Sequence, residues 1–205
     1  MSRRLGVLIS GRGSNLRAIV AAIRSGELDA DIAVVVSNRS EADGLAFAKS
    51  EGIDTVVLRP RDYPDRHAHD GAIADVLRAR GVDLVCLAGF MRLVGRPLLE
   101  AFPNRILNIH PSLLPAFPGL DAQAQAVGYG VRVSGATVHI VTAGLDDGPI
   151  VLQAVVPVLD NDTSASLAAR ILVEEHTLYP AAIRLVLDGA WHIEGRRFVR
   201  EASGR

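Results

Sequence analysis

Short apolar runs alternate with amphipathic stretches through the first half of the chain, and this alternation limits the fold more than any other feature. The apolar runs cover residues 5–9, 32–36, 55–58, 84–87 and 106–109. They are short and apolar on every side, which is typical of strands buried on both faces of a parallel sheet. Helical spacing of apolar residues predicts intervening helices over 15–25, 41–50, 64–80 and 96–102. We therefore expect an α/β fold with a doubly wound, mostly parallel, Rossmann-like sheet.

The second half of the chain has a different pattern. After a short helical segment over 122–129, residues 136–142 alternate in polarity and 150–156 form another apolar run, with a turn cluster between them. These two segments predict late antiparallel strands. Good N-cap residues at 162–164 precede a long helical pattern, and Pro180 inside it is expected to kink or divide that helix. Residues 191–198 predict a small final hairpin.

The chain length and composition favour one domain without a leader or membrane span. The 205 residues contain no internal repeat or linker, so we expect a single domain over 1–205, with a phosphate-binding half of about 1–105 and a catalytic half of about 106–205. A formal charge of −1 argues against a nucleic-acid or anionic-membrane surface. The single cysteine, Cys86, indicates a reducing compartment. The expected protein is cytoplasmic, binds small molecules, and is a monomer or weak homodimer.

A glycine-rich loop follows the first predicted strand and opens the first predicted helix. It reads Ser-Gly-Arg-Gly-Ser-Asn over residues 10–15. Glycines permit a tight turn, and the free amides of a helix N-terminus suit a phosphate. The loop is not a dinucleotide fingerprint, because Leu16 stands where the third glycine would be, and it lacks the lysine of a P-loop. A βα turn without any ligand is the alternative.

Asn108 and His110 lie two residues apart at the end of the fifth predicted strand. Residues at this spacing project to the same side of a strand, so the amide and the imidazole point together. At the carboxyl end of a parallel strand such a pair can stabilise an oxyanion or transfer a proton. A hydrogen-bonded structural histidine is an equally good interpretation. Cys86 lies in an apolar strand, where an inert role is favoured over a nucleophilic one.

Two acids, Asp146 and Asp147, precede Gly148 in the turn between the late strands. Turn acids are usually solvated. A carboxylate close to His110 would instead favour the imidazolium form of that ring, although sequence spacing cannot show the contact. The six histidines are scattered without a metal-ligand spacing, so no metal is expected.

Several motifs together resemble the folate-dependent formyltransferases, over nearly the whole chain. They are the segments 10–16, 87–92, 108–115, 137–139 and 145–149, and Glu175-His176 with Tyr179-Pro180. The resemblance implies formyl transfer from 10-formyltetrahydrofolate, as co-substrate, to an amine. The opening segment 10–16 is typical of members that formylate 5-phosphoribosylglycinamide in purine (IMP) synthesis. Two alternatives stay open, a formyltransferase for another amine such as an amino sugar, and a non-catalytic phosphosugar- or folate-binding module.

The resemblance also implies roles for individual residues. Asn108 matches an oxyanion-stabilising amide that also contacts the folate, His110 the catalytic histidine, and Asp146 the aspartate that keeps this histidine protonated. The ribonucleotide contacts are a phosphate-binding segment and one acid, namely Gly13, Ser14, Asn15 and Glu175. The folate contacts are an arginine and two loops, namely Arg66; Met91, Arg92, Leu93 and Val94; and Thr142, Ala143, Gly144, Leu145 and Asp146.

One stretch departs from the family pattern. After Pro118-Gly119 the family usually has a histidine and then a basic residue, whereas this chain reads Leu-Asp-Ala-Gln-Ala-Gln over 120–125. Ala116 likewise stands where a polar residue is common. The departure puts one substrate-side contact in doubt and leaves Asn108, His110 and Asp146 untouched.

Overall fold

The computed structural model describes residues 3–201, and the chain divides into two compact units, Met1–Asn108 and Ile109–Arg205. Unit 1 alternates strands and helices. Its strands are β1 (Arg4–Ile9), β2 (Asp31–Ser37), β3 (Thr55–Val57), β4 (Leu84–Leu87) and the start of β5 (Ile106–His110). Its helices are α1 (Ser14–Arg24), α2 (Asp43–Ser50), the 3₁₀ turn η1 (Pro60–Asp62), α3 (Arg66–Ala79) and α4 (Arg96–Ala101).

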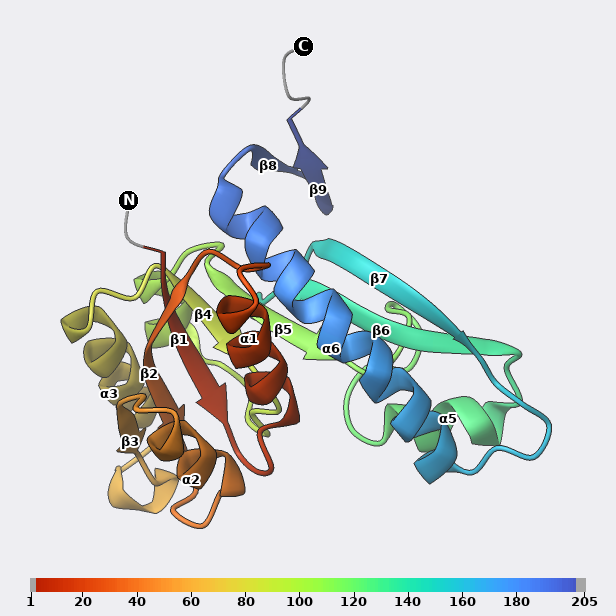
Figure 1. Ribbon diagram of the computed structural model, residues 1–205, viewed down its shortest axis with the longest axis horizontal. Coiled ribbons are helices and arrows are strands. Elements are labelled where there is room, and N and C mark those ends of the chain that lie inside the picture. The colour runs from red at the N-terminus through yellow and green to blue at the C-terminus, as the bar shows by residue number, and fades with distance from the viewer. Residues whose placement is uncertain (1–2, 202–205) are drawn as a thin grey trace. The chain divides into compact units, whose positions relative to one another are not determined.

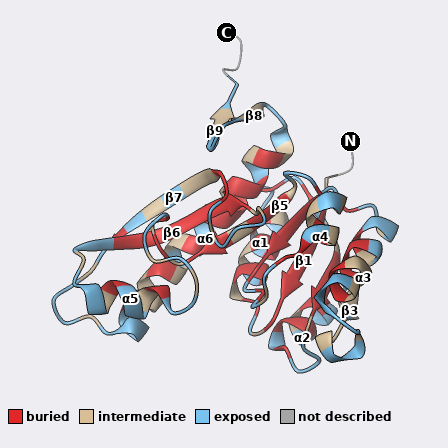
Figure 2. Ribbon diagram, turned by 180° about the vertical axis from the view of Figure 1, so that it is seen from behind, coloured by how far each residue is buried: buried red, intermediate tan, exposed pale blue. Residues whose placement is uncertain are grey.

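The strands of unit 1 form a parallel sheet in the order β3-β2-β1-β4-β5. Because βαβ crossovers are right-handed, the helices that connect β1, β2 and β3 cover one face of the sheet. The connections to β4 and β5 run in the opposite direction across the sheet, so their helices cover the other face. Figure 1 shows α1 in front of the strands, and Figure 2, from behind, shows α3 and α4. The central strand β1 is fully buried at Leu5, Val7, Leu8 and Ile9. The predicted doubly wound arrangement is confirmed.

The glycine-rich loop is pressed backbone to backbone against the start of α2. Gly13 has φ 71°, a left-handed conformation, and caps α1. A Cβ atom on Gly13 would lie 2.9 Å from the Cα of Gly44, closer than real Cβ contacts allow. The Gly44 amide donates to the Gly11 carbonyl at 3.1 Å. Both the backbone conformation and the space therefore require glycine at position 13.

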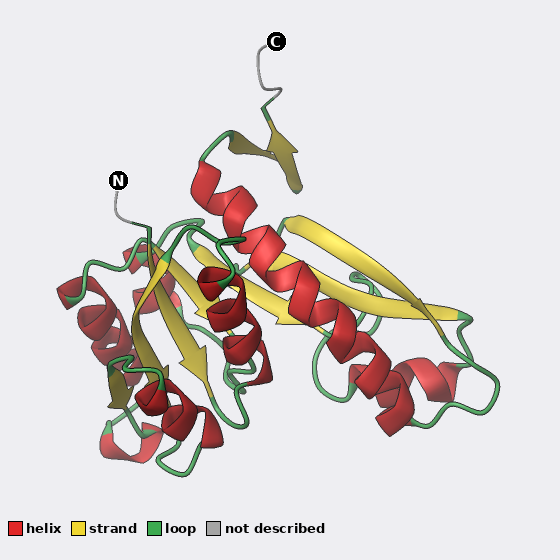
Figure 3. Ribbon diagram, viewed as in Figure 1, coloured by secondary structure: helices red, strands yellow, loops and turns green. Residues whose placement is uncertain are grey.

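Unit 2 is built around an antiparallel pair of strands, β6 (Val133–Ile140) and β7 (Ile150–Pro157). The register of this pair shifts between Val138 and His139. The short helix α5 (Ala122–Tyr129) and the long helix α6 (Ser164–Asp188) complete the unit with the final hairpin β8 (Trp191–Glu194) and β9 (Arg197–Arg200). Figure 3 shows α6 crossing β6 and β7. The predicted late antiparallel strands are confirmed, and the fold class is α/β.

Helix α6 runs unbroken through Pro180, so of the two effects expected of this proline, a kink or a division, the division does not occur. Proline lacks the amide that would bond to the carbonyl four residues earlier, but the rest of the helix keeps its hydrogen bonds. Thr163 caps the start, its hydroxyl accepting from the Ser166 amide at 3.2 Å. Pro180 itself is buried, as are Tyr179 and Ile183 on either side. Burial of this stripe stabilises the helix by more than one lost hydrogen bond costs.

Within residues 3–201, none of the helices combines the length and the apolar character needed to cross a membrane.

Candidate active site

Strand β5 carries Asn108 and His110 at its carboxyl end, as the sequence predicts. Asn108 is half-buried and pairs with Leu87 of β4 in the parallel register. His110 is buried, with 5% of its surface exposed. A buried imidazole at a strand end needs hydrogen-bond partners for both ring nitrogens, or it loses free energy on folding.

Both ring nitrogens of His110 face acceptors from unit 2. Nε2 lies 2.8 Å from the carbonyl oxygen of Phe117, and Nδ1 lies 3.3 Å from Oδ2 of Asp146. A carbonyl only accepts, so the proton on Nε2 is assigned from this contact. The carboxylate beside Nδ1 and the carbonyl beside Nε2 together fix the orientation of the ring.

Asp146 lies among three donors and is the acid that contacts His110. The Gly119 amide donates to its Oδ2 at 2.8 Å, and His139 Nε2 lies 3.5 Å from its Oδ1. Burial raises the pKa of the Asp146 carboxyl. The hydrogen bond from His139, the Gly119 amide and the charge of His110 together outweigh burial and hold this pKa below its ordinary value. Asp146 also has φ 49°, a left-handed conformation that aspartate tolerates better than most residues.

The neighbouring acid, Asp147, is exposed and turned to other partners. Its carboxylate accepts from the Thr142 hydroxyl, and its carbonyl accepts from Arg196. The structure therefore separates the two acids as expected, with Asp146 directed at His110 and Asp147 on the surface. The glycine that follows them is required by space, because a Cβ on Gly148 would lie 1.7 Å from the Ile140 carbonyl oxygen.

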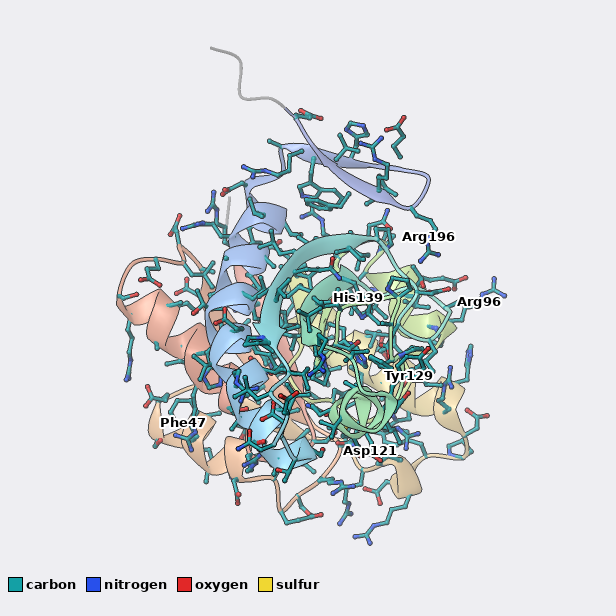
Figure 4. The ribbon with its side chains drawn as sticks, turned by 90° about the vertical axis from the view of Figure 1, so that its right-hand side faces the viewer. Phe47, Arg96, Asp121, Tyr129, His139 and Arg196 are labelled. Atoms are coloured by element: carbon teal, nitrogen blue, oxygen red, sulfur yellow. The ribbon has the colours of Figure 1, made fainter. Side chains whose placement is uncertain are left out.

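His139 is a site residue that the sequence analysis did not assign. It is 2% exposed, its Nδ1 lies 3.1 Å from the Ile140 carbonyl, and its Nε2 faces Asp146. Figure 4 shows His139 at the strands of unit 2, with Asp121 and Tyr129 at α5. Alternation along β6 places His139 on the same face as Thr137, and this alternation is the sequence pattern that could have indicated a role for His139. It could not show that the face meets the turn containing Asp146.

Thr137 holds the chain that follows His110. Its hydroxyl donates to the Ser112 carbonyl at 2.7 Å and accepts from the Leu114 amide at 3.0 Å. Gln153 on β7 donates to both the Thr137 hydroxyl and the Leu114 carbonyl. The polar residues that alternate along β6 therefore have two roles in the interior. Thr137 holds the segment after His110, and His139 faces Asp146.

The turn over residues 117–121 reaches both members of the His110–Asp146 pair. The Phe117 carbonyl accepts from His110, and the Gly119 amide donates to Asp146. Phe117 and Asp121 have φ 53° and 55°, a left-handed conformation that aspartate tolerates but that is unfavourable for phenylalanine. The Phe117 ring contacts the Tyr129 ring edge to face, with centroids 5.9 Å apart, which helps to hold the turn.

In unit 1 the glycine-rich loop is joined to the predicted folate loop Met91–Val94. The hydroxyl of Ser10 accepts from the Met91 amide at 2.8 Å and donates to Asn38 at 2.7 Å. The Ser10 amide donates to the Gly89 carbonyl at 3.1 Å. Asn15 is buried within the first turn of α1, whereas Met91 and Leu93 are exposed.

The remaining predicted residues fall on separate elements. Arg66 opens α3 and lies on the surface, 3.8 Å from Asp70. Glu175 is buried on α6. In the turn between β6 and β7, Thr142 is half-buried and the residues 143–145 are exposed. Among residues 3–201, no three His, Cys, Asp or Glu side chains are grouped so as to hold a metal ion.

The formyl transferase family model matches residues 3–183, so the chain belongs to the formyl transferase family. Among relatives, it is 41% identical to the phosphoribosylglycinamide formyltransferase of Bacillus subtilis, covering 90% of this chain and 95% of that protein. A glycinamide ribonucleotide transformylase from Symbiobacterium toebii matches with 58% identity and a TM-score of 0.96, covering 98% and 95% of the two chains.

A third relative is much longer. The human trifunctional purine biosynthetic protein adenosine-3 is 45% identical over 91% of this chain, but this chain spans only 18% of its length. A fourth match carries a different name, a formyltetrahydrofolate deformylase from Pseudomonas syringae, with 27% identity and a TM-score of 0.90.

Proposed function

We propose that this chain is a phosphoribosylglycinamide formyltransferase, which transfers the formyl group of 10-formyltetrahydrofolate to the amine of 5-phosphoribosylglycinamide in purine synthesis. The observation that carries the proposal is the buried His110 with Asp146 against Nδ1, at the carboxyl end of the strand that also holds Asn108. The similarity to bacterial enzymes of this name, along most of both chains, supports the same conclusion.

The reaction needs donors where negative charge develops. The amine nitrogen forms a bond to the formyl carbon, and charge moves to the formyl oxygen. Asn108 and His110 donate hydrogen bonds to that oxygen, and a preorganised donor of this kind is worth roughly 3 kcal/mol. The bond from the formyl carbon to the folate nitrogen then breaks. The proton that the amine loses passes to that nitrogen, through His110 or a water molecule.

The partners of His110 suggest how its donor is kept ready. Nδ1 faces Asp146, which holds the ring in orientation, while Nε2 donates to the Phe117 carbonyl. The formyl oxygen takes the place of this carbonyl as the acceptor when substrate binds. One acceptor replaces another, so the buried Nε2 donor of His110 is never left without a hydrogen bond.

The binding residues follow from the family resemblance. Gly13, Ser14 and Asn15 bind the phosphate through the N-terminus of α1, and Glu175 contacts the glycinamide end. Arg66, the loop Met91–Val94 and the turn Thr142–Asp146 bind the formyl folate. The proposed chemistry needs no metal and no covalent intermediate.

A direct assay tests this function. Purified protein is incubated with 10-formyltetrahydrofolate and 5-phosphoribosylglycinamide, and tetrahydrofolate formation is followed spectrophotometrically. Parallel reactions replace the ribonucleotide with water alone or with an amino sugar. We expect product only with the ribonucleotide. Product formation in water at the same rate would favour the deformylase activity named for the Pseudomonas relative, and product with the amino sugar alone would identify a different acceptor.

The glycine-rich loop gives a prediction specific to the ribonucleotide. Gly13→Val should raise the KM for 5-phosphoribosylglycinamide by about tenfold or more, because the side chain is strained at a left-handed φ and collides with Gly44. The KM for the folate should change little. Steady-state kinetics with each substrate varied in turn measure both constants.

Gly26→Val is the matched control for this prediction. Gly26 has φ 79°, so valine is strained there in the same way, but nothing lies within 4 Å of its Cβ position and it follows the far end of α1. This variant should keep the wild-type KM for the ribonucleotide. If Gly13→Val instead raises the folate KM and spares the ribonucleotide, the two substrates have been assigned to the wrong loops.

A further inference from the structure

The loop Met91–Val94 is fastened at both ends by side chains from other parts of unit 1. Its first amide, on Met91, donates to the Ser10 hydroxyl at 2.8 Å. The amide of Gly95, just after the loop, donates to Oδ2 of Asp70 at 2.6 Å. Between these points Met91 and Leu93 are 66% and 54% exposed. The loop therefore offers apolar side chains to a ligand while its two ends stay fixed.

Asp70 is a buried acid that the proposed reaction does not use. It lies on α3 with 2% of its surface exposed. Burying a carboxylate is unfavourable unless donors surround it. The Gly95 amide donates a hydrogen bond to it, whereas His69 Nδ1, 3.5 Å from its Oδ1, and Arg66 Nε, 3.8 Å from its Oδ2, lie close without a hydrogen bond. His69 is itself held by the Leu58 carbonyl, 2.9 Å from Nε2.

The contact between Asp70 and Gly95 depends on the absence of a side chain at position 95. A Cβ there would lie 2.6 Å from Asp70 Oδ2 and 3.2 Å from Arg66 Nε. Gly95 is the N-cap residue of α4 and makes no side-chain cap of its own. A carboxylate that accepts from a backbone amide forms one of the stronger hydrogen bonds in proteins. One acid thus fixes where the loop ends and where α4 begins.

We propose that Asp70 is a positioning residue for the formyl folate. It holds Gly95, and so the end of the loop Met91–Val94, and its charge orients the exposed guanidinium of Arg66. The proposal rests on the proposed function, since the loop and Arg66 are assigned to the folate there. It predicts that two folate contacts, one on a loop and one on a helix, depend on a side chain that does not touch the ligand.

The test compares Asp70→Ala and Asp70→Asn with the wild type. Asp70→Ala should raise the KM for 10-formyltetrahydrofolate about tenfold, as expected for loss of a hydrogen bond to a charged group. The KM for the ribonucleotide and kcat at saturation should stay unchanged. Asp70→Asn keeps an acceptor for the Gly95 amide and loses only the charge beside Arg66. Its KM for 10-formyltetrahydrofolate should therefore lie between that of the wild type and that of Asp70→Ala.

Ile73→Val is the control for a general weakening of α3. Ile73 is buried on the same helix, and removing a methylene from it destabilises the core without touching Gly95 or Arg66. Its folate KM should match the wild type. Equal rises of the folate KM in Ile73→Val and Asp70→Ala, or parallel rises for both substrates in Asp70→Ala, would overturn the positioning role.

Amide hydrogen exchange over residues 91–95 gives a readout that does not depend on turnover. These amides should exchange faster in Asp70→Ala than in Asp70→Asn, the wild type or Ile73→Val. Unchanged exchange, or faster exchange with an unchanged folate KM, would also overturn the role of Asp70. Absence of formyl transfer by the wild-type protein would overturn the proposed function instead, so the two failures are distinguishable.

Discussion

His110→Ala is expected to lower kcat for formyl transfer by about two to three orders of magnitude, the usual cost of removing one oxyanion donor. Asn108→Ala should cause a loss of similar size, because both side chains act on the same developing charge. KM for both substrates should change much less, since the donors act mainly in the transition state. The measurement is steady-state turnover with both substrates saturating.

The control for this pair is His192→Ala. His192 lies exposed on β8 and should tolerate the change with wild-type turnover. Circular dichroism and thermal unfolding show whether each variant is folded before its rate is interpreted. Turnover near the wild-type rate in folded His110→Ala and Asn108→Ala proteins would contradict the proposal that these two residues of β5 catalyse formyl transfer.

Asp146→Asn should lower turnover by about a hundredfold near neutral pH, a typical effect of disabling an acid–base group. Asparagine can still accept from the Gly119 amide, so the turn is retained, but the charge opposite His110 and His139 is lost. Turnover falls because no charged carboxylate then orients the His110 ring. Asp147→Asn should keep wild-type activity, since Asp147 is exposed and paired with Thr142. An equal loss in both variants would mean that the wrong carboxylate has been chosen.

The same substitution should change how stability depends on pH. The pKa of Asp146 is lower in the folded protein than its ordinary value, so its ionised form stabilises the fold. This contribution is complete above the unfolded pKa of about 3.9 and disappears as the pH falls through the lower folded pKa. Thermal unfolding should find Asp146→Asn less stable than the wild type at neutral pH, with the difference shrinking below about pH 4. A difference that grows on acidification would contradict the assigned direction.

Local sequence patterns predicted most of the fold. The strand over 84–87 and the helix over 122–129 have the predicted bounds, because Gly and Pro punctuate the chain around them and the apolar periods are clear. Of the two effects expected of Pro180, division of α6 does not occur, because the packing of the helix overrides this local rule. That packing involves residues far away in the sequence, which a local pattern cannot describe.

The candidate site was predictable only in part for the same reason. Asn108 and His110 share a strand, so their common face follows from a period of two residues. The contact of Asp146 with His110 joins residues 36 positions apart, and the resemblance to a family, not the spacing, suggested it. His139 and Asp70 were missed because a buried histidine or acid has no local signature. Only their partners in space distinguish them from solvated side chains.

The turn over residues 117–121 touches the His110–Asp146 pair entirely through main-chain atoms, the Phe117 carbonyl and the Gly119 amide. Every amino acid except proline can supply both groups, so the identity of most side chains beyond Gly119 is not constrained by the pair. The stretch Leu120-Asp121-Ala122-Gln123, which departs from the pattern that the family resemblance implies, is therefore compatible with these two contacts. Substitutions in this stretch can therefore accumulate, or be introduced by design to alter the surface beside the site, while the catalytic ring keeps its partners.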